Sequence, residues 1–530
     1  MTLRIDEEDN LFGAHVTMKG FLPDDDPMVL FSKEIYPMFN DKDFEDIYSK
    51  IGRGAKSPSF LTMVTLLQYR ENMSDEEAAD ACIKRIDWKI ALHLPFDAKQ
   101  QFDSSTLCRF RRRLKENEKS GIAFDKILEG IKTKGFIKKN TNQRIDATHI
   151  VSHVNRISTT DLLFRAVKCV VEEISKSQIP FYEEFIPEDI KERYEGKFSS
   201  FGMSKEKRTD KMAEIIEDGL YLKKLLAENK NIDISKFTQL KIMETIFEEN
   251  VKITTKEINS TIFIDVEEVQ SPKQTIFDPR DTSLKMGMKG KTSWVGSKCH
   301  IVETAVKGKR NFITGMIYQK ASGSDQKIHD KYREINNKSK LQPEKIFADQ
   351  NYISGESIFN YQKNNQELLG IIGSDNSKKA NEFKLNKFEI DMETLTAVCP
   401  MKKKSEKYSK MKDGSYNIYF AYDDCTKCIH TLECAQTGKD KKRRLHVNQY
   451  YEQIRERRLL QVTESFRKSM SVRAQVEGTI SETVRELGLR FAKYHGEDGH
   501  QFQFYMTGAA LNVKRLIKAM TKGMDMSPAK

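Results

Sequence analysis

Three carboxylates in this chain occupy positions where their charge needs an explanation. Asp146 lies inside the β-branched segment "QRIDATHIVSHV", Asp349 ends "EKIFAD" before the turn "QNYISG", and Glu477 lies in "RAQVEGTISETVRELGLR". Asp is disfavoured in the middle of a strand unless its face meets something polar. In sheets with crossover helices, sites collect outside the carboxyl ends of strands, which is where Asp349 falls.

The helix that carries Glu477 has charges beside its apolar stripe. At about 100° per residue, one stripe is formed by Val472, Val476, Ile480, Val484 and Leu487. Arg473 falls inside this stripe and Glu477 on its border, so we expect the carboxylate to point toward the interior. The alternative is an ordinary Arg–Glu pair at i,i+4, worth a few tenths of a kcal/mol.

A shared metal ion would account for all three acids. Carboxylates that meet in one cleft repel one another unless a cation lies between them, and hard oxygen ligands select Mg²⁺ or Mn²⁺. Two such ions about 3.5–4 Å apart can activate a water or a 3′-hydroxyl and stabilise the leaving oxygen of a phosphodiester. The alternative is that Asp146 keeps an edge strand soluble and Asp349 forms a turn.

Three other residues compete for a role in such a site. Asp278 and Asp281 lie in the basic loop "FDPRDTSLKMGMKGKT", where we expect turn residues and a DNA-facing segment rather than ligands. His149 falls on the strand face opposite Asp146, because side chains alternate along a strand. We expect it to be a structural histidine.

The elements around these acids predict an α/β protein. After the first strand, residues 158–250 have helical periodicity. They are followed by the alternating segments "TSWVGSKCHIVETA" and "RNFITGMIYQKASG", which predict an antiparallel hairpin. A polar helix at 325–337, the strand "EKIFAD", a helix at 355–363 and the strand "ELLGIIG" come next. This order predicts a mixed sheet flanked by helices.

The segment from residue 40 to 140 is predicted to be helical and to bind DNA. Ser74 and Glu77 form a capping box, and "FDSSTLCRFRRRLKEN" offers Asp103 or Ser104 as the cap of a basic helix. The basic residues of that helix are Arg109, Arg111, Arg112, Arg113 and Lys115. They suit phosphate contacts better than a merely solvated face. A helix-turn-helix is a weak interpretation, because the connector "RIDWKIALHLPFDAKQQ" is too long for the usual turn.

Four cysteines predict a structural zinc site. Cys399, Cys425, Cys428 and Cys434 include one Cys-x-x-Cys pair, and His430 is an alternative ligand. In a reducing compartment, this pattern suits tetrahedral Zn²⁺. The alternative is four unligated thiols in a loop-rich insertion.

Composition favours a polyanionic partner and the cytoplasm. The 530 residues include 89 Lys and Arg against 78 Asp and Glu, a net charge of +11, which favours nucleic acid over a merely solvated surface. The acidic start "MTLRIDEEDN" lacks the apolar core of a secretory signal. We find no apolar run that approaches the roughly 20 residues of a membrane span.

Taken together, these motifs resemble the DDE transposases of bacterial insertion sequences, whose catalytic core is RNase H-like. "RIDATHIVSHV" resembles the strand of the first Asp, "FADQNYISGESI" that of the second, and "RAQVEGTISETVRELGLRFAKYHG" the helix of the last Glu. The resemblance assigns Asp146, Asp349 and Glu477 as the catalytic, Mg²⁺-binding triad. Arg473 is expected to orient Glu477 or a phosphate, with a structural ion pair as the alternative.

The resemblance is incomplete around the third acid. Related transposases often carry a Tyr, Arg, Glu and Lys at fixed spacing. Here Met470 stands at the Tyr position and Val484 at the Lys position, with Arg485 beside it. These departures bear on contacts to a terminal phosphate and leave the triad intact.

The resemblance also implies a domain plan. It comprises a helical DNA-binding domain (1–140), the first strand of the RNase H-like core (141–157), a helical insertion (158–255), the rest of the core (256–390), a Cys-rich insertion (391–450) and C-terminal helices (451–530). The implied activity is cleavage at terminal inverted repeats and joining of 3′-hydroxyls to target DNA by a homodimer in a synaptic complex. A DNA-binding protein derived from such an element, without transposition activity, and a zinc-organised nucleic-acid scaffold are the alternatives.

Overall fold

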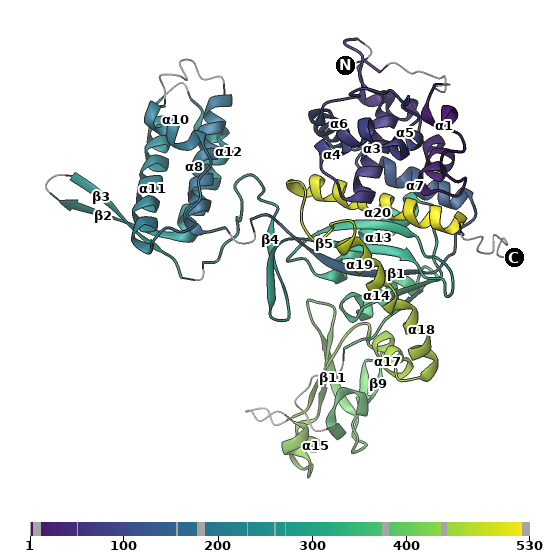
Figure 1. Cartoon of the computed structure of the whole chain (residues 1–530). Coiled ribbons are helices and arrows are strands. Elements are labelled where there is room, and N and C mark those ends of the chain that lie inside the picture. Colours follow the sequence, from purple (N-terminus) through teal and green to yellow (C-terminus); the bar gives the residue numbers. More distant parts are fainter. Residues whose placement is uncertain are drawn as a thin grey trace.

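The chain folds into a central sheet with three groups of elements around it. The computed structural model describes residues 2–3, 12–49, 51–154, 157–177, 186–229, 232–258, 261–270, 272–373, 381–435 and 442–521. In Figure 1 the N-terminal helices lie above the sheet, a second helical group lies to one side, and a strand-rich segment lies below. No described helix has a stretch long and apolar enough to cross a bilayer.

The central sheet is mixed. Its strands are β1 (Gln143–Val151), β4 (Lys285–Lys289), β5 (Thr292–Thr304), β6 (Ile313–Lys320), β7 (Lys345–Ala348) and β8 (Glu367–Leu369). Strand β5 is antiparallel to β1, β4 and β6, whereas β7 is parallel to both β1 and β8. The path β6-β5-β1-β7-β8 therefore crosses the sheet, with β4 pairing along the first part of β5. The predicted hairpin and the mixed α/β sheet are confirmed.

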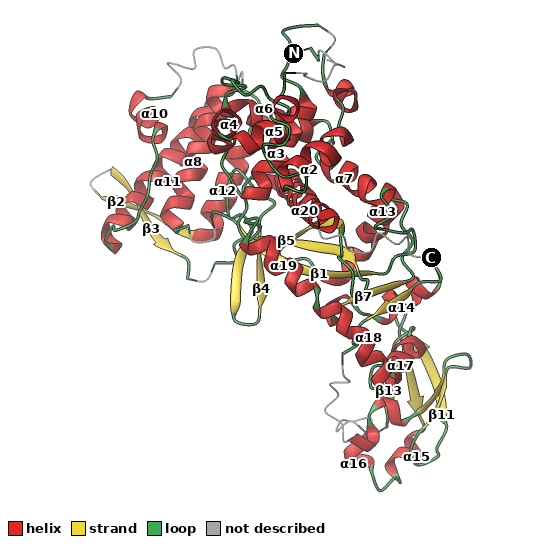
Figure 2. Cartoon of the chain, turned by 45° about the vertical axis from the view of Figure 1, so that its right-hand side comes forward, coloured by secondary structure: helices red, strands yellow, loops and turns green. Residues whose placement is uncertain are grey.

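Helices cover both faces of this sheet. They are α13 (His329–Lys338), α14 (Gly355–Gln362), α17 (Tyr451–Leu460), α18 (Glu464–Ala474), α19 (Val476–Arg485) and α20 (Gly496–Thr521). One face carries Ile145 and Val302, which pack in a cluster with Tyr332 of α13 and Ile358 of α14. The other face carries Ile301, whose cluster includes residues of α20. Figure 2 shows α18 and α19 crossing this part of the molecule, where they contact β7 and β1 respectively.

The N-terminal helices pack on α20 rather than directly on the sheet. They are α1 (Ala14–Thr17), α2 (Pro27–Leu30), α3 (Pro58–Glu71), α4 (Asp75–Lys84), α5 (Ile86–Ala91), α6 (Ser104–Glu116) and α7 (Ile122–Thr133). The predicted capping box of Ser74 and Glu77 begins α4, and Asp103 caps α6. Helix α20 contacts α3 and α7, and one hydrophobic cluster runs from these helices through α20 to the sheet.

The insertion after β1 is helical at first but ends in strands. Its helices are α8 (Thr159–Lys176), α10 (Glu188–Glu195), α11 (Lys205–Glu228) and α12 (Thr238–Asn250). Strands β2 (Val251–Ile258) and β3 (Thr261–Glu268) then form an antiparallel pair that the sequence interpretation did not include. The β-branched residues of "VKITTKEI" and "TIFIDVEE" were the available signal.

The Cys-rich segment has its own small core. Its strands are β9 (Glu389–Asp391), β10 (Thr396–Val398), β11 (Ser405–Lys410), β12 (Tyr416–Phe420) and β13 (Arg444–Val447), and its short helices are α15 (Tyr422–Thr426) and α16 (Thr431–Cys434). Buried Phe388, Ile418, Phe420 and Leu445 form this core, and Cys399, Cys425 and Cys434 pack against it.

A buried ionic network holds α18, α19 and α20 on the sheet. Glu303 of β5 has no exposed surface and pairs with Arg144 of β1 and Arg515 of α20, at 2.8 and 2.9 Å. Thr479 of α19 donates its hydroxyl to the same carboxylate at 2.9 Å. Arg144 also donates to the main-chain oxygen of Val472, at 2.7 Å.

That last contact lies where the C-terminal helix is interrupted. The sequence predicts one continuous helix over 473–490, but α18 ends at Ala474 and α19 begins at Val476 and ends at Arg485. In a continuous helix, the carbonyl of Val472 would accept from the N–H four residues later. The prediction of one continuous helix is therefore wrong, and the break coincides with a contact to Arg144 that the helix sequence does not contain.

Replacing Glu303 by Gln should loosen α19 from the sheet. The change leaves the buried guanidinium of Arg144 without its carboxylate partner, and it leaves Arg515 paired with Glu482 alone. Breaking a buried ion pair in this way costs about 3–5 kcal/mol. We expect faster hydrogen exchange of α19 amides and a lower unfolding midpoint. Glu486→Gln is the control, because that side chain is 57% exposed. Equal protection of α19 in both variants would contradict the role given to Glu303.

Candidate active site

Asp146 and Asp349 are brought together by strand register. Strands β1 and β7 pair in parallel as Gln143 with Ile346, Arg144 with Phe347 and Ile145 with Ala348. The next position in the same register sets Asp146 beside Asp349. Neighbouring strands lie about 4.8 Å apart, so two carboxylates that are far apart in sequence share one edge of the sheet.

The surroundings of Asp146 work against its charge. Burial raises the pKa of its carboxyl group and Asp349 raises it further, while the Ala147 N–H, Arg473 and Lys289 act in the opposite direction. The balance is a pKa above the ordinary value of an Asp. Asp146 and Asp349 are both partly buried, and the positive charge near them does not fully offset their repulsion. A bound cation would do so.

Glu477 of α19 lies close to Asp146, but its side chain is on the surface of the protein and not in the interior. Its side chain is 68% exposed, so the expected inward orientation is wrong. The residues of α19 that are buried against the sheet are Val476, Thr479 and Thr483. The interruption of the helix at Gln475 fixes which face is buried, and Glu477 lies on the rim.

Arg473 links the first and third acids. Its guanidinium lies 3.4 Å from Asp146 Oδ2 and 3.5 Å from Glu477 Oε1. The i,i+4 pair predicted from sequence is therefore present, and it extends to an acid on another element. Arg473 therefore bridges Asp146 and Glu477.

The residues that depart from the transposase pattern, Met470 and Val484 with its neighbour Arg485, lie in different environments. Met470 packs beside a cluster that contains Phe347 and Phe466, which seats α18 on β7. Val484 is half-buried, and Arg485 is exposed. Met470 therefore serves packing in this chain.

The rival residues lie on other faces. The ring of His149 lies 4.9 Å from that of Trp294 at an interplanar angle of 39°, and burial lowers the pKa of His149 to about 4. Asp278 and Asp281 accept main-chain N–H groups two residues ahead, as turn residues do. Both side chains are buried, at 1% and 4% exposed, and their predicted role as turn residues is confirmed.

The basic helix α6 presents only part of its charge to solvent. Arg109 and Arg112 are exposed, and Lys115 is partly exposed. Arg113 lies 4.2 Å above the ring of Tyr48. Arg111 is 6% exposed and donates to Asp75 at 2.8 Å, so it holds α6 to α4 instead of facing a phosphate.

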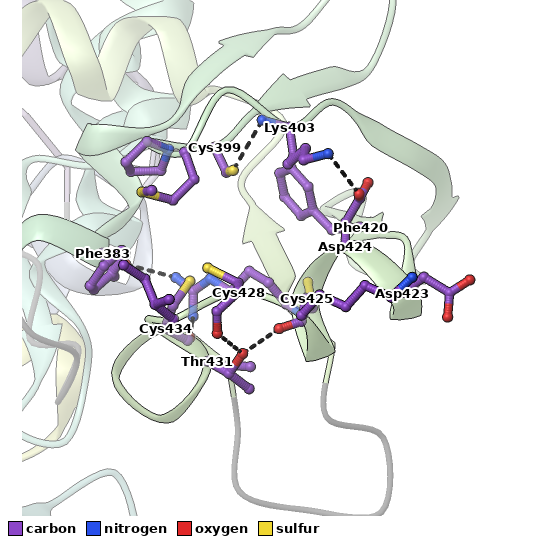
Figure 3. Close-up of a pocket in the computed structure, with 16 residues that line it drawn as sticks. Phe383, Cys399, Lys403, Phe420, Asp423, Asp424, Cys425, Cys428, Thr431 and Cys434 are labelled. Atoms are coloured by element: carbon purple, nitrogen blue, oxygen red, sulfur yellow. Dashed lines mark hydrogen bonds and ion pairs between the residues drawn. The ribbon is translucent and has the colours of Figure 1, made fainter.

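The four predicted zinc ligands line one cavity of about 380 Å³. Figure 3 shows Cys399, Cys425, Cys428 and Cys434 around it. Burial raises the pKa of Cys425 and Cys434. In the part of the chain that is described, these sulfur atoms do not form a set of three within 4.8 Å of one another. They share a cavity without the closeness of a formed ligand set.

Two residues that support the acids were missed from sequence. Arg144 lies two positions before Asp146, so strand alternation put it on the same face and was an available signal. Tyr352 is buried, and its hydroxyl lies 2.6 Å from His300 Nδ1. Burial raises the pKa of Tyr352, and the nearby charges of Asp146 and Asp349 raise it further. No local pattern identified Tyr352.

Two family models match the chain in separate regions. A model described as "Transposase DDE domain" matches residues 398–517, which include Glu477, and one described as "Transposase domain (DUF772)" matches residues 16–113. No significant match was found among curated proteins or solved structures. The two matches support a DDE-type transposase of an insertion sequence.

Neutralising Asp146 should stabilise the metal-free protein and abolish its response to Mg²⁺. A carboxyl group whose pKa is raised by folding reduces stability as the pH rises through that pKa. Asp146→Asn removes this penalty at neutral pH. We expect its unfolding midpoint to exceed that of the parent without metal, and Mg²⁺ to raise only the parent's midpoint.

Asp330→Asn serves as the control, because Asp330 is 82% exposed on α13. A midpoint of Asp146→Asn below the parent's without metal, or an equal Mg²⁺ response in both proteins, would contradict this account of the site.

Proposed function

We propose that this chain is an active DNA transposase, which cleaves phosphodiester bonds at the ends of its element and joins the 3′-hydroxyls to target DNA. The observation that carries the proposal is the register of β1 and β7, which sets Asp146 beside Asp349. Glu477 lies across Arg473 from Asp146 and supplies the third acid. The transposase family matches agree with this activity.

The strand order supports an RNase H-like core. Three antiparallel strands in chain order, β1, β5 and β6, are followed by β7 and β8, both parallel to β1. The resulting order, third-second-first-fourth-fifth, is the one this interpretation requires. The first acid then lies on the central strand and the second at the end of its parallel neighbour.

Asp146, Asp349 and Glu477 would together hold Mg²⁺ or Mn²⁺. Their oxygens are the donors that these ions prefer, and the raised pKa of Asp146 marks a place that lacks positive charge. When bound, the ions would activate the attacking water or 3′-hydroxyl and stabilise the leaving oxygen. Arg473, released from Asp146, would remain beside Glu477 to orient it or to contact a phosphate.

Double-stranded DNA is the proposed partner, both as element ends and as target. The net charge of +11 favours a polyanion. On α6, Arg109, Arg112 and Lys115 are available to phosphates, with Arg113 beside them. Lys289, at the end of β4, is near enough to Asp146 to lower its pKa. It would contact the DNA backbone beside the site. We further propose a homodimer in the synaptic complex and action in the bacterial cytoplasm.

The alternative is a transposase-derived DNA-binding protein without catalysis. Nothing would then maintain three acids around one arginine, and the repulsion between Asp146 and Asp349 would have no purpose. The geometry of the carboxylates therefore favours the enzyme.

We also propose a structural Zn²⁺ bound by Cys399, Cys425, Cys428 and Cys434. The four thiols line one cavity, and the raised pKa of Cys425 and Cys434 marks thiols that need a cation to become thiolates. Small side-chain rotations would be required to bring the sulfurs to zinc. Four protein ligands leave no open position, so the ion would hold the segment together.

Glu477→Gln should separate chemistry from binding. Glu477 is exposed and lies outside the packed face of α19, so the fold should survive the change. Cleavage of an end-containing duplex with Mg²⁺ should fall by orders of magnitude, because the charge that faces the cation is removed. Binding to the same duplex should persist. Combining the change with Asp146→Asn or Asp349→Asn should add little, since the acids act as a unit.

The matched control is Glu486→Gln, an exposed glutamate just after the same helix. Near-normal cleavage by Glu477→Gln, with only a small loss of stability, would mean that the Arg473–Glu477 pair is an ordinary helix contact.

Arg109 and Arg112 should contribute to DNA binding without affecting the fold. Replacing both with Ala should weaken binding and reduce the slope of its salt dependence by roughly one unit for each phosphate that is no longer neutralised. Arg111→Ala is the informative comparison, because that side chain is buried against Asp75 and should instead lower the unfolding midpoint. If the double variant keeps the parent's salt slope, these arginines only face solvent.

A further inference from the structure

A second group of metal-ligating side chains lies at the root of the helical insertion. His153 follows β1, Asp278 lies in the loop before β4, and His495 lies in the turn before α20. One ligand atom from each lies within 4.8 Å of the other two, and no other such set of three occurs in the described ranges. None of the three belongs to the transposase triad.

Asp278 has two properties expected of a metal ligand: it is buried, and its carboxylate is held in a fixed orientation. Its side chain is 1% exposed, and Oδ1 accepts the N–H of Arg280 at 3.0 Å, which fixes the carboxylate plane. Oδ2 is buried and points toward the two other segments, 3.2 Å from His153 Nε2 and 3.9 Å from Arg165 Nη1. A buried carboxylate is costly unless positive charge meets it, and here His153 and Arg165 lie beside it.

The two histidines are placed by the same loop. Asp281, three residues after Asp278, accepts the N–H of Gly496 at 2.6 Å and so ties the turn that carries His495 to this loop. The rings of His153 and His495 meet edge to face at 4.4 Å. Partial burial and the neighbouring His153 lower the pKa of His495, which favours the neutral imidazole that a metal ion requires.

We propose that His153, Asp278 and His495 bind a divalent transition-metal ion of the Zn²⁺ class. Two imidazoles and one carboxylate are ligands that such ions favour over Mg²⁺. With metal–ligand bonds of about 2.0–2.1 Å, tetrahedral ligand atoms lie about 3.4 Å apart. The 3.2 Å between His153 and Asp278 already matches, and the exposed His495 has room to close the rest.

This ion would fasten three segments that are remote in sequence. His153 lies in the connection between β1 and α8, the point at which the helical insertion leaves the sheet. In Figure 1 the insertion stands beside the sheet, with β4 between them. Binding would therefore fix the insertion relative to the core, and a water would complete the coordination.

Cobalt titration of the full-length chain tests this inference. The protein carries Cys425→Ser and Cys428→Ser to remove the thiol site, and excess Mg²⁺ occupies the carboxylate triad. We expect one Co²⁺ per chain with visible d–d absorption, and a lower hydrogen-exchange rate in the first turn of α8. His495→Ala should weaken Co²⁺ binding at least about tenfold, with an unchanged metal-free unfolding midpoint because the ring is exposed.

His446→Ala, in β13, is the control and should bind Co²⁺ as the parent does. Asp278→Asn should likewise weaken Co²⁺ binding. Absence of Co²⁺ binding in the parent, or equal affinity in the parent and His495→Ala, would overturn the proposal and leave an ordinary His–Asp ion pair.

Discussion

The buried carboxylate of Glu303 is the interaction on which the geometry of the site depends. It has no contact with solvent, and two guanidinium groups and one hydroxyl satisfy it. These partners come from β1, α19 and α20, so one charge fixes the last two helices against the sheet. Arg144 also donates to the main-chain oxygen of Val472, near the end of α18, and so connects the network to the junction between α18 and α19. The position of Glu477 thus depends on the contacts of Val472 and Thr479, which lie on either side of it in the sequence.

One face of the sheet carries both a fully paired carboxylate, Glu303, and an incompletely paired one, Asp146. At Glu303 the charges are fully compensated, and the result is rigidity. Two residues along β1 from Arg144, the same face carries Asp146, whose raised pKa records incomplete compensation by Arg473 and Lys289. A rigid, paired network beside an underpaired acidic cluster is what a cation site needs, because the ligands are held while the charge remains unsatisfied. On β1, Arg144 therefore contributes to stability, while Asp146, two residues later, belongs to the proposed catalytic site.

Local patterns predicted the elements well and their connections poorly. Alternation identified the strand of Asp146 and the β5–β6 hairpin, and capping residues located the starts of α4 and α6. Register, in contrast, depends on pairing between distant segments, so the placement of Asp349 beside Asp146 rested on resemblance. Arg111 looked like a phosphate ligand because nothing in its helix reveals Asp75. The burial of Asp278 was hidden for the same reason, since three remote segments create it.

The central claim is that Asp146, Asp349 and Glu477 form one cation site. Its most direct measurement is the anomalous difference map of crystals grown with Mn²⁺. The account predicts a peak between the carboxylates of Asp146 and Asp349, with Glu477 turned toward it and Arg473 moved away from Asp146. A map without density at these acids, in crystals that retain the Arg473–Asp146 contact at saturating Mn²⁺, would contradict it.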